Sequence, residues 1–162
     1  MRAILFGGTG MIGQGVLREL LARPSVTQVL SVGRTPLPQK DPKLTELLRQ
    51  DLFDWSDVGD ALKGYDAVFF CLGVSSGGMS EEAYRKLSLD LPLAAARAIV
   101  QHSPQATFCF ISGAGTDATE RGSTMWARVK GAAENRLQEV GFKAVYSFRP
   151  GYIQPMDGIE SK

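Results

Sequence analysis

The sequence has little cysteine, only one histidine and almost no net charge. Its 162 residues include two cysteines, Cys71 and Cys109, and both stand in apolar, strand-like runs. Such positions are typical of reduced core thiols rather than of a disulfide or a metal pair. His102 stands alone at the end of an apparent helix. Because a zinc site needs several such ligands together, we expect no metal centre.

The charges are nearly balanced, with 18 basic and 17 acidic side chains and a net charge of +1. Without a clustered basic stripe, there is no electrostatic argument for a nucleic acid or a membrane surface as a partner. No apolar run is long enough to span a bilayer. The amino terminus lacks the layout of a signal peptide, so we expect a cytoplasmic protein. The length and the 44% hydrophobic content predict one globular domain over residues 1–162.

Glycine is abundant, and several glycines gather where a strand pattern passes directly into a helix pattern. The apolar run that starts at Arg2 ends in the sequence Gly7-Gly-Thr-Gly-Met-Ile-Gly13. Glycines at 7, 10 and 13 allow a tight turn, close approach of a pyrophosphate, and packing of the helix against its strand. The free N–H groups at the helix start favour an anion. This arrangement predicts a dinucleotide-binding turn, and a purely structural turn is the alternative.

The rest of the chain alternates between helical and strand-like patterns. Helical spacing runs from Ile12 to Leu21 and is ended by Pro24, whereas a helix capped by Ser80 is expected to kink or restart at Pro92. A further helix is expected over residues 124–140, with strands over 27–33, 66–73, 106–111 and 143–148. This order predicts a Rossmann-like α/β fold, a doubly wound parallel sheet in three α/β/α layers.

Residues 41–50 give conflicting signals. Asp41 and Pro42 resemble the start of a helix, and the leucines that follow have helical spacing. The alternation of strands and helices, however, requires a third strand here, ending at residues 50–52. We expect the tertiary context to override the local propensity.

The second strand ends in Gly33-Arg34-Thr35, about twenty residues after the glycine turn, where NAD-binding proteins of this type carry an acidic residue. The planar guanidinium of Arg34 can instead pair with a 2′-phosphate. NADP(H) is therefore favoured as the cofactor, and NAD(H) remains possible. A solvated loop arginine is the alternative. The same residue argues against an S-adenosylmethionine-dependent methyltransferase, which also requires an acid at this point.

With these landmarks, the chain resembles the atypical short-chain dehydrogenase/reductase superfamily, the NAD(P)-binding Rossmann proteins of the TIP30-like and NAD-dependent epimerase/dehydratase-like kind. The resemblance rests on an ordered series of short motifs that spans the whole chain. They are Gly7-Gly-Thr-Gly-Met-Ile-Gly13, Val32-Gly-Arg34, Asp51-Leu52, Cys71-Leu-Gly73, Ile111-Ser-Gly-Ala-Gly-Thr116, Val129-Lys-Gly-Ala-Ala-Glu134 and Arg149-Pro-Gly151.

The resemblance implies a role in cofactor binding for most of these positions. The pyrophosphate would be held by the glycine turn, the adenosine phosphate by the end of the second strand, and the adenine and the nucleotide crevice by residues after the third and fourth strands. The implied residues are Gly7, Thr9, Gly10, Met11, Ile12, Gly13, Arg34, Thr35, Asp51, Leu52, Leu72, Gly73, Lys130, Pro150 and Gly151. Asp51 could instead cap the next turn, and Leu72 could belong to the core.

The resemblance also implies catalytic roles. Ser112 matches the family's catalytic serine, and Lys130 matches the lysine that holds the nicotinamide ribose and activates a tyrosine one helical turn earlier. Trp126 stands at that tyrosine position. An indole donates a hydrogen bond but does not exchange a proton in the accessible pH range. The usual acid/base group is therefore missing.

Several interpretations of this change remain open. Proton transfer could have moved to Tyr152 or, with less support, to Tyr84. Trp126 could form a stacking wall for a planar substrate, with water as the proton source. The protein could also bind NADP(H) without catalysis, as a sensor or interaction module, with Trp126 as a packed core residue. The sequence therefore predicts an oxidoreductase or a non-catalytic NADP(H)-binding protein.

Relatives that the chain resembles continue past the position of Gly158 into a segment that covers the substrate cleft. The C-terminal segment is therefore expected to be short or missing here, which would leave the cleft open to water. The expected partners are the dinucleotide and an unidentified small-molecule substrate, with no nucleic acid and no membrane. The chain is expected to be a monomer or a homodimer.

Overall fold

A single parallel sheet forms the centre of the molecule. The computed structural model describes residues 1–155 and 158–159. The sheet has the strand order β3-β2-β1-β4-β5-β6, and each pair of neighbours is parallel. Its strands are β1 (Arg2–Phe6), β2 (Gln28–Gly33), β3 (Leu44–Leu48), β4 (Ala67–Phe70), β5 (Thr107–Ile111) and β6 (Ala144–Phe148). This topology confirms the Rossmann-like α/β fold.

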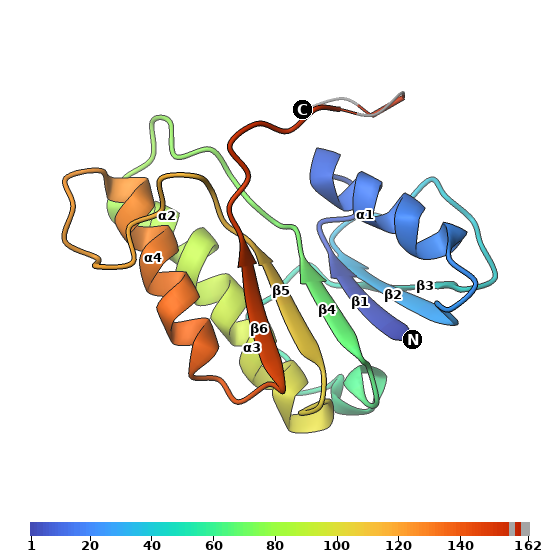
Figure 1. Ribbon diagram of the computed structural model, residues 1–162. Coiled ribbons are helices and arrows are strands. Elements are labelled where there is room, and N and C mark those ends of the chain that lie inside the picture. Colours follow the sequence, from blue (N-terminus) through green and yellow to red (C-terminus); the bar gives the residue numbers. More distant parts are fainter. Residues whose placement is uncertain (156–157, 160–162) are drawn as a thin grey trace.

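Helices lie on both faces of the sheet and complete three layers (Figure 1). Helix α1 (Met11–Ala22) covers one face, and the other face carries α2 (Glu81–Arg85), α3 (Leu91–His102) and α4 (Met125–Gln138). A short 3₁₀ turn, η1 (Gly59–Leu62), precedes β4, and a π-helical turn, η2 (Lys86–Asp90), joins α2 to α3. Each face has its own apolar cluster, one centred on Phe70 and Phe108 and one on Leu5 and Leu17.

The helix boundaries follow the expected local chemistry. The Oγ atom of Ser80 accepts a hydrogen bond from the N–H of Ala83 at 3.2 Å, which caps α2. Pro92 lies at the start of α3, directly after the π-helical turn η2, which accommodates a residue without an N–H in a continuous helical stretch. The helix restarts there after the π-helical turn, as its sequence predicts. Helix α1 ends at Ala22, just before Pro24.

The ambiguous segment after Asp41 is a strand, as the alternation of elements requires. The carboxylate of Asp41 accepts a hydrogen bond from the N–H of Lys43 at 2.8 Å and forms a turn instead of a helix start. The strand β3 then pairs with β2 from Leu44 to Leu48, so the ladder outweighs the helical spacing of the leucines. It ends slightly earlier than expected.

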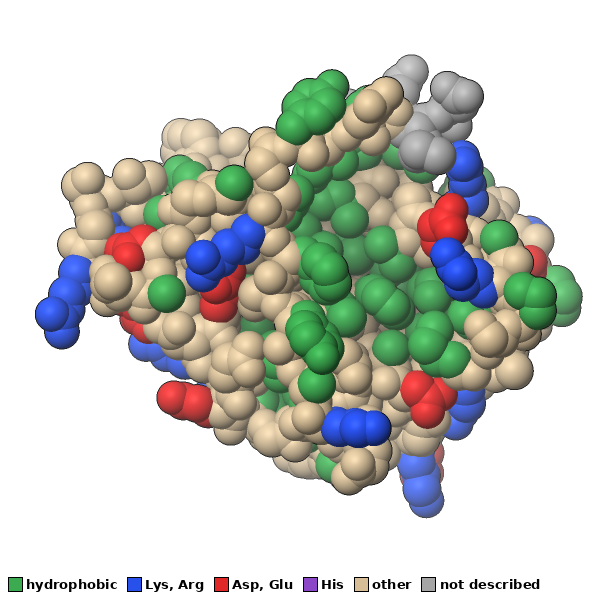
Figure 2. Space-filling view, in the orientation of Figure 1, with side chains coloured by type: hydrophobic (Ala, Val, Ile, Leu, Met, Phe, Trp, Pro, Cys, Tyr) green, Lys and Arg blue, Asp and Glu red, His purple; other side chains and the backbone are tan. Residues whose placement is uncertain are grey.

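The two faces of the sheet are covered unequally. On the face that carries α1, side chains of β4, β5 and β6 form rows across the strands. Phe69 is in register with Cys109, and Cys109 is in register with Tyr146. Tyr146 and Phe148 are 58% and 53% exposed. In Figure 2, hydrophobic side chains gather at the centre of this side, over the part of the sheet that Figure 1 shows in the same orientation. We call Phe69, Ile111, Tyr146 and Phe148 the open face.

Both cysteines are free thiols, Cys109 buried and Cys71 partly so. Burial, aided by the neighbouring Cys109, raises the pKa of Cys71 to about 12, so it stays protonated at neutral pH. The described residues contain no group of histidine, cysteine and acidic side chains that could hold a metal ion. Within the same residues, no helix has the length and apolar character needed to cross a membrane.

Candidate dinucleotide-binding site

The candidate site lies at the carboxyl ends of the strands, where β1 is flanked by β2 on one side and β4 on the other. At this point the order of the strands reverses, and open α/β sheets bind their ligands in the crevice that such a reversal creates. Three cavities meet here, and Leu72 lines all of them. They lie on either side of the turn between β1 and α1.

Two glycines of this turn are required by the backbone itself. Gly7 has φ +78°, and a Cβ atom there would lie 2.9 Å from the backbone of Cys71 and Leu72. A Cβ atom on Gly13 would lie 1.9 Å from the carbonyl oxygen of Gly7. Gly10 differs, since its Cβ atom would meet only the Gly7 oxygen, at 3.4 Å. The first two glycines hold the turn together, whereas the space beside Gly10 is open.

The start of α1 has no capping side chain. Gly10 occupies the N-cap position, and the first turn of the helix contains no acidic residue. The Gly10 N–H donates to the Gly7 oxygen at 2.9 Å, which closes the turn. The helix start therefore presents N–H groups and the positive end of its dipole with no side chain to satisfy them. These groups fit the pyrophosphate of a dinucleotide.

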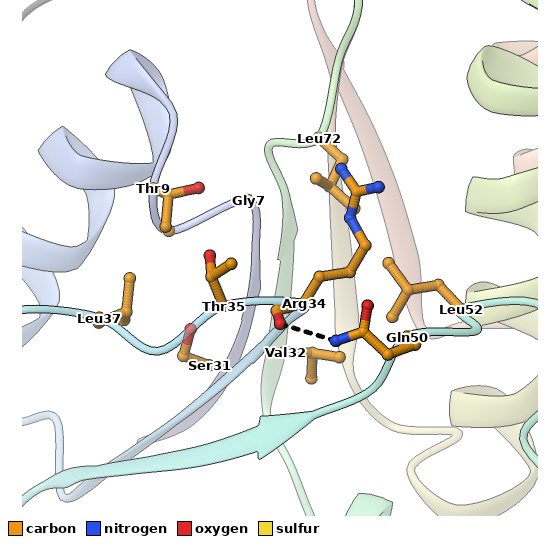
Figure 3. A pocket seen from close by; sticks show the side chains of 12 residues that line it. Gly7, Thr9, Ser31, Val32, Arg34, Thr35, Leu37, Gln50, Leu52 and Leu72 are labelled. Atoms are coloured by element: carbon orange, nitrogen blue, oxygen red, sulfur yellow. Dashed lines mark hydrogen bonds between the residues drawn. The ribbon is translucent and has the colours of Figure 1, made fainter.

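A cavity of about 310 Å³ lies on the β2 side of this turn. Figure 3 shows the Arg34 side chain reaching into it toward Leu72, with Thr35 and Ser31 nearby. The Gln50 amide donates to the Arg34 backbone oxygen at 3.1 Å and fixes the loop. In the part of the chain that the structure describes, the Arg34 guanidinium forms no ion pair. Its charge is free to meet an anionic ligand.

A neighbouring cavity of about 520 Å³ is lined by Asp51, Leu52 and Leu72, as expected, and by Phe53 and Leu87. The Asp51 carboxylate accepts a hydrogen bond from the Phe53 N–H at 2.7 Å, so it also caps a local turn. Leu52 is 8% exposed and belongs to the core. Asp51 thus has the expected alternative role of capping a turn, and both residues also line the cavity. The apolar lining suits a flat base.

The third cavity, of about 480 Å³, lies between α1 and the loop after β5. It brings together Met11, Ile12, Ser112, Trp126 and Lys130, which stand far apart in the sequence. The lining also includes Cys71, Val74, Ile111 and Gly113, which are not predicted from the sequence, and Tyr84, which is predicted only as a secondary candidate for proton transfer.

Lys130 is a buried cation in this cavity, 8% exposed. Its Nζ donates to the backbone oxygen of Ile111 at 3.0 Å and lies 4.7 Å from the ring centroid of Phe110. Burial lowers the pKa of Lys130 to about 8, while the charge of Glu134 opposes that change. The ammonium is thus held in place by one hydrogen bond and keeps further N–H donors for a ligand.

Ser112 is fixed by the elements around it. Its N–H donates to the Phe148 oxygen at 2.7 Å, and its Oγ lies 2.9 Å from the Thr116 Oγ1. Below it, the Arg149 guanidinium binds both carboxylate oxygens of Glu134, with an Nε to Oε1 distance of 3.0 Å. This pair ties the end of β6 to α4. It gives a rigid support to residues 112–116 after β5, which we call the serine loop.

Glu134 stays charged although it is 7% exposed. Burial alone would raise the pKa of its carboxyl, but hydrogen bonds from Arg149 and Ser112 and the charges of Arg149 and Lys130 hold it below its usual range. No role for this residue is predicted from the sequence. The available signal was its spacing of four from Lys130, which places the two on one face of a helix.

Of the remaining expected residues, Trp126 lines a cavity, and Tyr152, Pro150 and Gly151 do not. A Cβ atom on Gly113 or Gly115 would lie 3.5 Å from the Trp126 ring, which forms one wall of the third cavity. Tyr152 is 84% exposed and lines none of the three cavities. Pro150 and Gly151 also line none of them, and the Pro150 oxygen accepts from the Ala114 N–H at 3.0 Å to support the serine loop.

Comparison with known proteins gives the family. The profile of the NAD(P)H-binding family matches residues 7–154, and the chain therefore belongs to this family. The mitochondrial protein fmp52 of Emericella nidulans is 32% identical over 158 residues, which cover 92% of this chain and 65% of the relative. HTATIP2 of Rattus norvegicus is 24% identical over 152 residues, covering 92% and 61%. The chain thus spans 61 to 65% of the length of these two curated relatives.

Solved structures share the fold. A short-chain dehydrogenase/reductase of Burkholderia vietnamiensis superposes with a TM-score of 0.72 at 19% identity, covering 96% of this chain and 85% of that one. A short-chain dehydrogenase of Burkholderia cenocepacia in complex with NADP gives 0.72 at 17% identity, covering 95% and 73%. MoeE5 in complex with UDP-glucose and NAD gives 0.71 at 22%, covering 92% and 54%. At such identities the likeness shows the fold alone.

The expected cytoplasmic location is wrong. Fungal relatives at 29 to 32% identity, from Emericella nidulans, Aspergillus terreus and Aspergillus oryzae, are named as mitochondrial proteins. The expectation rested on the missing layout of a secretory signal peptide, and that layout does not report on delivery to an organelle.

Proposed function

We propose that the chain binds NADP(H) across the carboxyl ends of β1, β2, β4 and β5, with the adenosine end beside Arg34 and the nicotinamide end beside Lys130. The uncapped start of α1 carries this proposal, because the backbone is built around Gly7 and Gly13 so that Gly10 faces open space. A turn with only a structural purpose would not need that opening. The cavities on either side match the two halves of a dinucleotide.

The preference for the phosphorylated cofactor rests on Arg34. Its guanidinium has no anionic partner among the described side chains, and the end of β2 offers no carboxylate to accept hydrogen bonds from a ribose. A 2′-phosphate would provide the missing anion in a planar, two-point contact. Similar folds hold either cofactor, NADP in one short-chain dehydrogenase and NAD in MoeE5.

We further propose that the bound cofactor serves an oxidoreductase reaction on a carbonyl or alcohol. When bound, NADP(H) supplies or accepts the hydride. Ser112 lines the third cavity, and rotation of its hydroxyl away from Thr116 and Glu134 would let it donate a hydrogen bond to a substrate oxygen. Lys130 is placed to hold the ribose hydroxyls through its free N–H donors. Trp126 forms a flat wall against which a planar substrate can stack.

Trp126 also supports a second candidate, a cofactor-binding protein without turnover. The resemblance to short-chain dehydrogenase/reductases implies a proton-donating phenol at this position, and the indole of Trp126 has no proton to transfer. In that case the chain would report the cofactor state to a partner.

Calorimetric titration with NADPH, NADH and S-adenosylmethionine tests the binding proposal. We expect NADPH to bind more tightly than NADH, and S-adenosylmethionine not to bind. Absence of NADPH binding would contradict the proposal outright. NADPH oxidation with aldehydes, ketones and quinones then separates the two candidates, since an enzyme turns over on the order of 1 per second or faster.

A further inference from the structure

Carbonyl reduction needs a proton as well as a hydride, and the third cavity contains a group that can supply it. Trp126 cannot, and the Cys71 thiol is a weak donor because burial raises its pKa to about 12. Lys130, whose Nζ donates to the Ile111 oxygen, has the ribose hydroxyls as its proposed partners. The one phenol on the lining of this cavity, among the residues that the structure describes, is that of Tyr84.

The side chain of Tyr84 lines the third cavity. The side chain is 3% exposed and its ring belongs to the core beneath α2–α4. Within the described ranges, the hydroxyl has no hydrogen-bond partner, and yet it is not one of the buried unpaired polar atoms, which are the Oγ atoms of Ser88 and Ser147. The hydroxyl therefore keeps some contact with solvent, although the side chain as a whole is almost fully buried. An O–H group in this position can both donate and accept a proton.

Tyr84 is held firmly in this position. Its helix, α2, starts at the Ser80 cap, and the Tyr84 N–H donates to the Ser80 oxygen at 3.0 Å. An ion pair of 2.8 Å between Glu81 and Arg128 joins α2 to α4, the helix that carries Trp126 and Lys130. The distance between the phenol and the other cavity residues is thus set by packed elements, which is the condition for efficient proton transfer.

The other tyrosines lie elsewhere. Tyr152 is 84% exposed, and Tyr146 is 58% exposed on the open face. Tyr65 lies under Arg2, whose guanidinium carbon is 4.5 Å from its ring centroid, at the opposite end of β1 from the glycine turn. Because the chain has four tyrosines in all, Tyr84 is the phenol that the fold brings to this cavity.

We propose that Tyr84 is the proton donor of this site and takes the place of the phenol that is absent at position 126. This inference rests on the proposed NADP(H)-dependent reaction. In reduction, the carbonyl carbon gains a hydride from the reduced dinucleotide, which is left oxidised, and the carbonyl oxygen takes the Tyr84 proton. The C=O π bond breaks, and one C–H and one O–H bond form. Water in the cavity returns a proton to the phenolate, and oxidation of the alcohol follows the same steps in reverse.

The test compares Tyr84→Phe with Tyr146→Phe, the same change at an exposed site. NADPH affinity, NADPH oxidation with benzaldehyde, cyclohexanone and menadione, and the NMR signal of the tyrosine ring carbon that bears the hydroxyl are measured for each. We expect Tyr84→Phe to lower the turnover rate by about a hundredfold or more with unchanged NADPH affinity. The NMR signal missing from this variant should shift in the natural protein when NADP⁺ is added. Tyr146→Phe should change neither the rate nor the affinity.

Each result of this test supports or overturns a different part of the proposal. Natural turnover that survives in Tyr84→Phe overturns the role of Tyr84 and leaves the proposed reaction intact, with Lys130 or water as the donor. A Tyr84 signal that does not respond to saturating NADP⁺ overturns the placement of the phenol beside the cofactor, whatever the rates. Absence of turnover with the whole panel contradicts the proposed reaction itself, and the role of Tyr84 falls with it, while NADPH binding still separates that case from a failed cofactor site.

Discussion

Individual residues of the site could be assigned from the sequence when their role depends on chain-local chemistry. Arg34 is an example, because its place after the second strand predicts a position in the crevice at the carboxyl ends of the strands, and it lines the first cavity there. Gln50 could not be found in this way, since it reaches the same cavity only through the pairing of β3 with β2. The choice between Tyr84 and Tyr152 depended likewise on how the helices pack.

Replacing Arg34 tests the cofactor preference. We expect Arg34→Ala to weaken NADPH binding by about 1.5 to 3 kcal/mol, the range for a charge-assisted hydrogen bond, and to change NADH binding little. Calorimetric titration of both cofactors measures the difference. Arg18→Ala, which removes an exposed arginine of α1, serves as the control and should change neither affinity. A variant that keeps the full NADPH preference would show that Arg34 does not contact the 2′-phosphate.

Lys130 gives the site a pH dependence. Its side chain carries a positive charge only while protonated, and its pKa is lowered to about 8, chiefly by burial. NADPH affinity should therefore be highest below pH 8 and fall as the pH rises through that value. Glu134→Gln removes the negative charge that favours the ammonium, so the fall should move to lower pH. Fluorescence titration of NADPH across pH measures both curves.

The comparison variant Lys130→Met should bind NADPH more weakly than the natural protein, and its affinity should show no step near pH 8. An identical pH curve for Lys130→Met and the natural protein would assign the step to another group.

The lowered pKa of Lys130 also makes the stability of the fold depend on pH. The unfolded chain binds the Lys130 proton up to about pH 10.5, so between about 8 and 10.5 this residue's contribution to the unfolding free energy rises with pH.

At the scale of elements, the order of strands and helices was predictable because each element has its own apolar periodicity and end signals. Residues 41–50 show that the tertiary structure can override such local signals. Their local signals are helical, but the β2 edge offers a complete set of hydrogen bonds, and five residues pair with it. Local propensities are worth less than about 1 kcal/mol per residue, so a ladder and its packing outweigh them.

Two glycines of the β1–α1 turn should respond differently to substitution. Gly10 has φ −81° and ψ 163°, which any residue adopts, so Gly10→Val should leave the fold intact. Its branched side chain would fill the space where a pyrophosphate approaches, and NADPH binding should be lost. Gly13→Ala would place a Cβ atom 1.9 Å from the Gly7 oxygen and should lower the unfolding free energy by about 1 to 3 kcal/mol.

Urea unfolding and NADPH titration of both variants separate the two effects. Binding that persists in folded Gly10→Val would mean that the turn has only a structural role. Unchanged stability of Gly13→Ala would mean that the helix can move away from the turn.

For the whole molecule, the unequal covering of the sheet matters most. Parallel sheets usually bury both faces, and their strands are apolar on both sides for that reason. The strands β4 and β5 are apolar on both sides, as this rule predicts. The side chains of the open face nevertheless remain partly in contact with solvent. A contiguous apolar surface of this kind binds apolar molecules. The sequence pattern could not reveal it, since a buried strand and an uncovered one carry the same residues.

The open face should therefore bind an environment-sensitive apolar dye, and Tyr146→Thr with Phe148→Thr should reduce that binding. Threonine keeps the preference for a strand, and both side chains are more than half exposed, so the unfolding free energy should change by less than about 1 kcal/mol. Phe108→Ala, in the fully buried core of the same sheet, should instead cost about 3 to 5 kcal/mol. Dye fluorescence is measured with saturating NADPH present, which removes binding to the cofactor cavities. Equal fluorescence of the double variant and the natural protein would place the dye elsewhere and contradict an accessible apolar face.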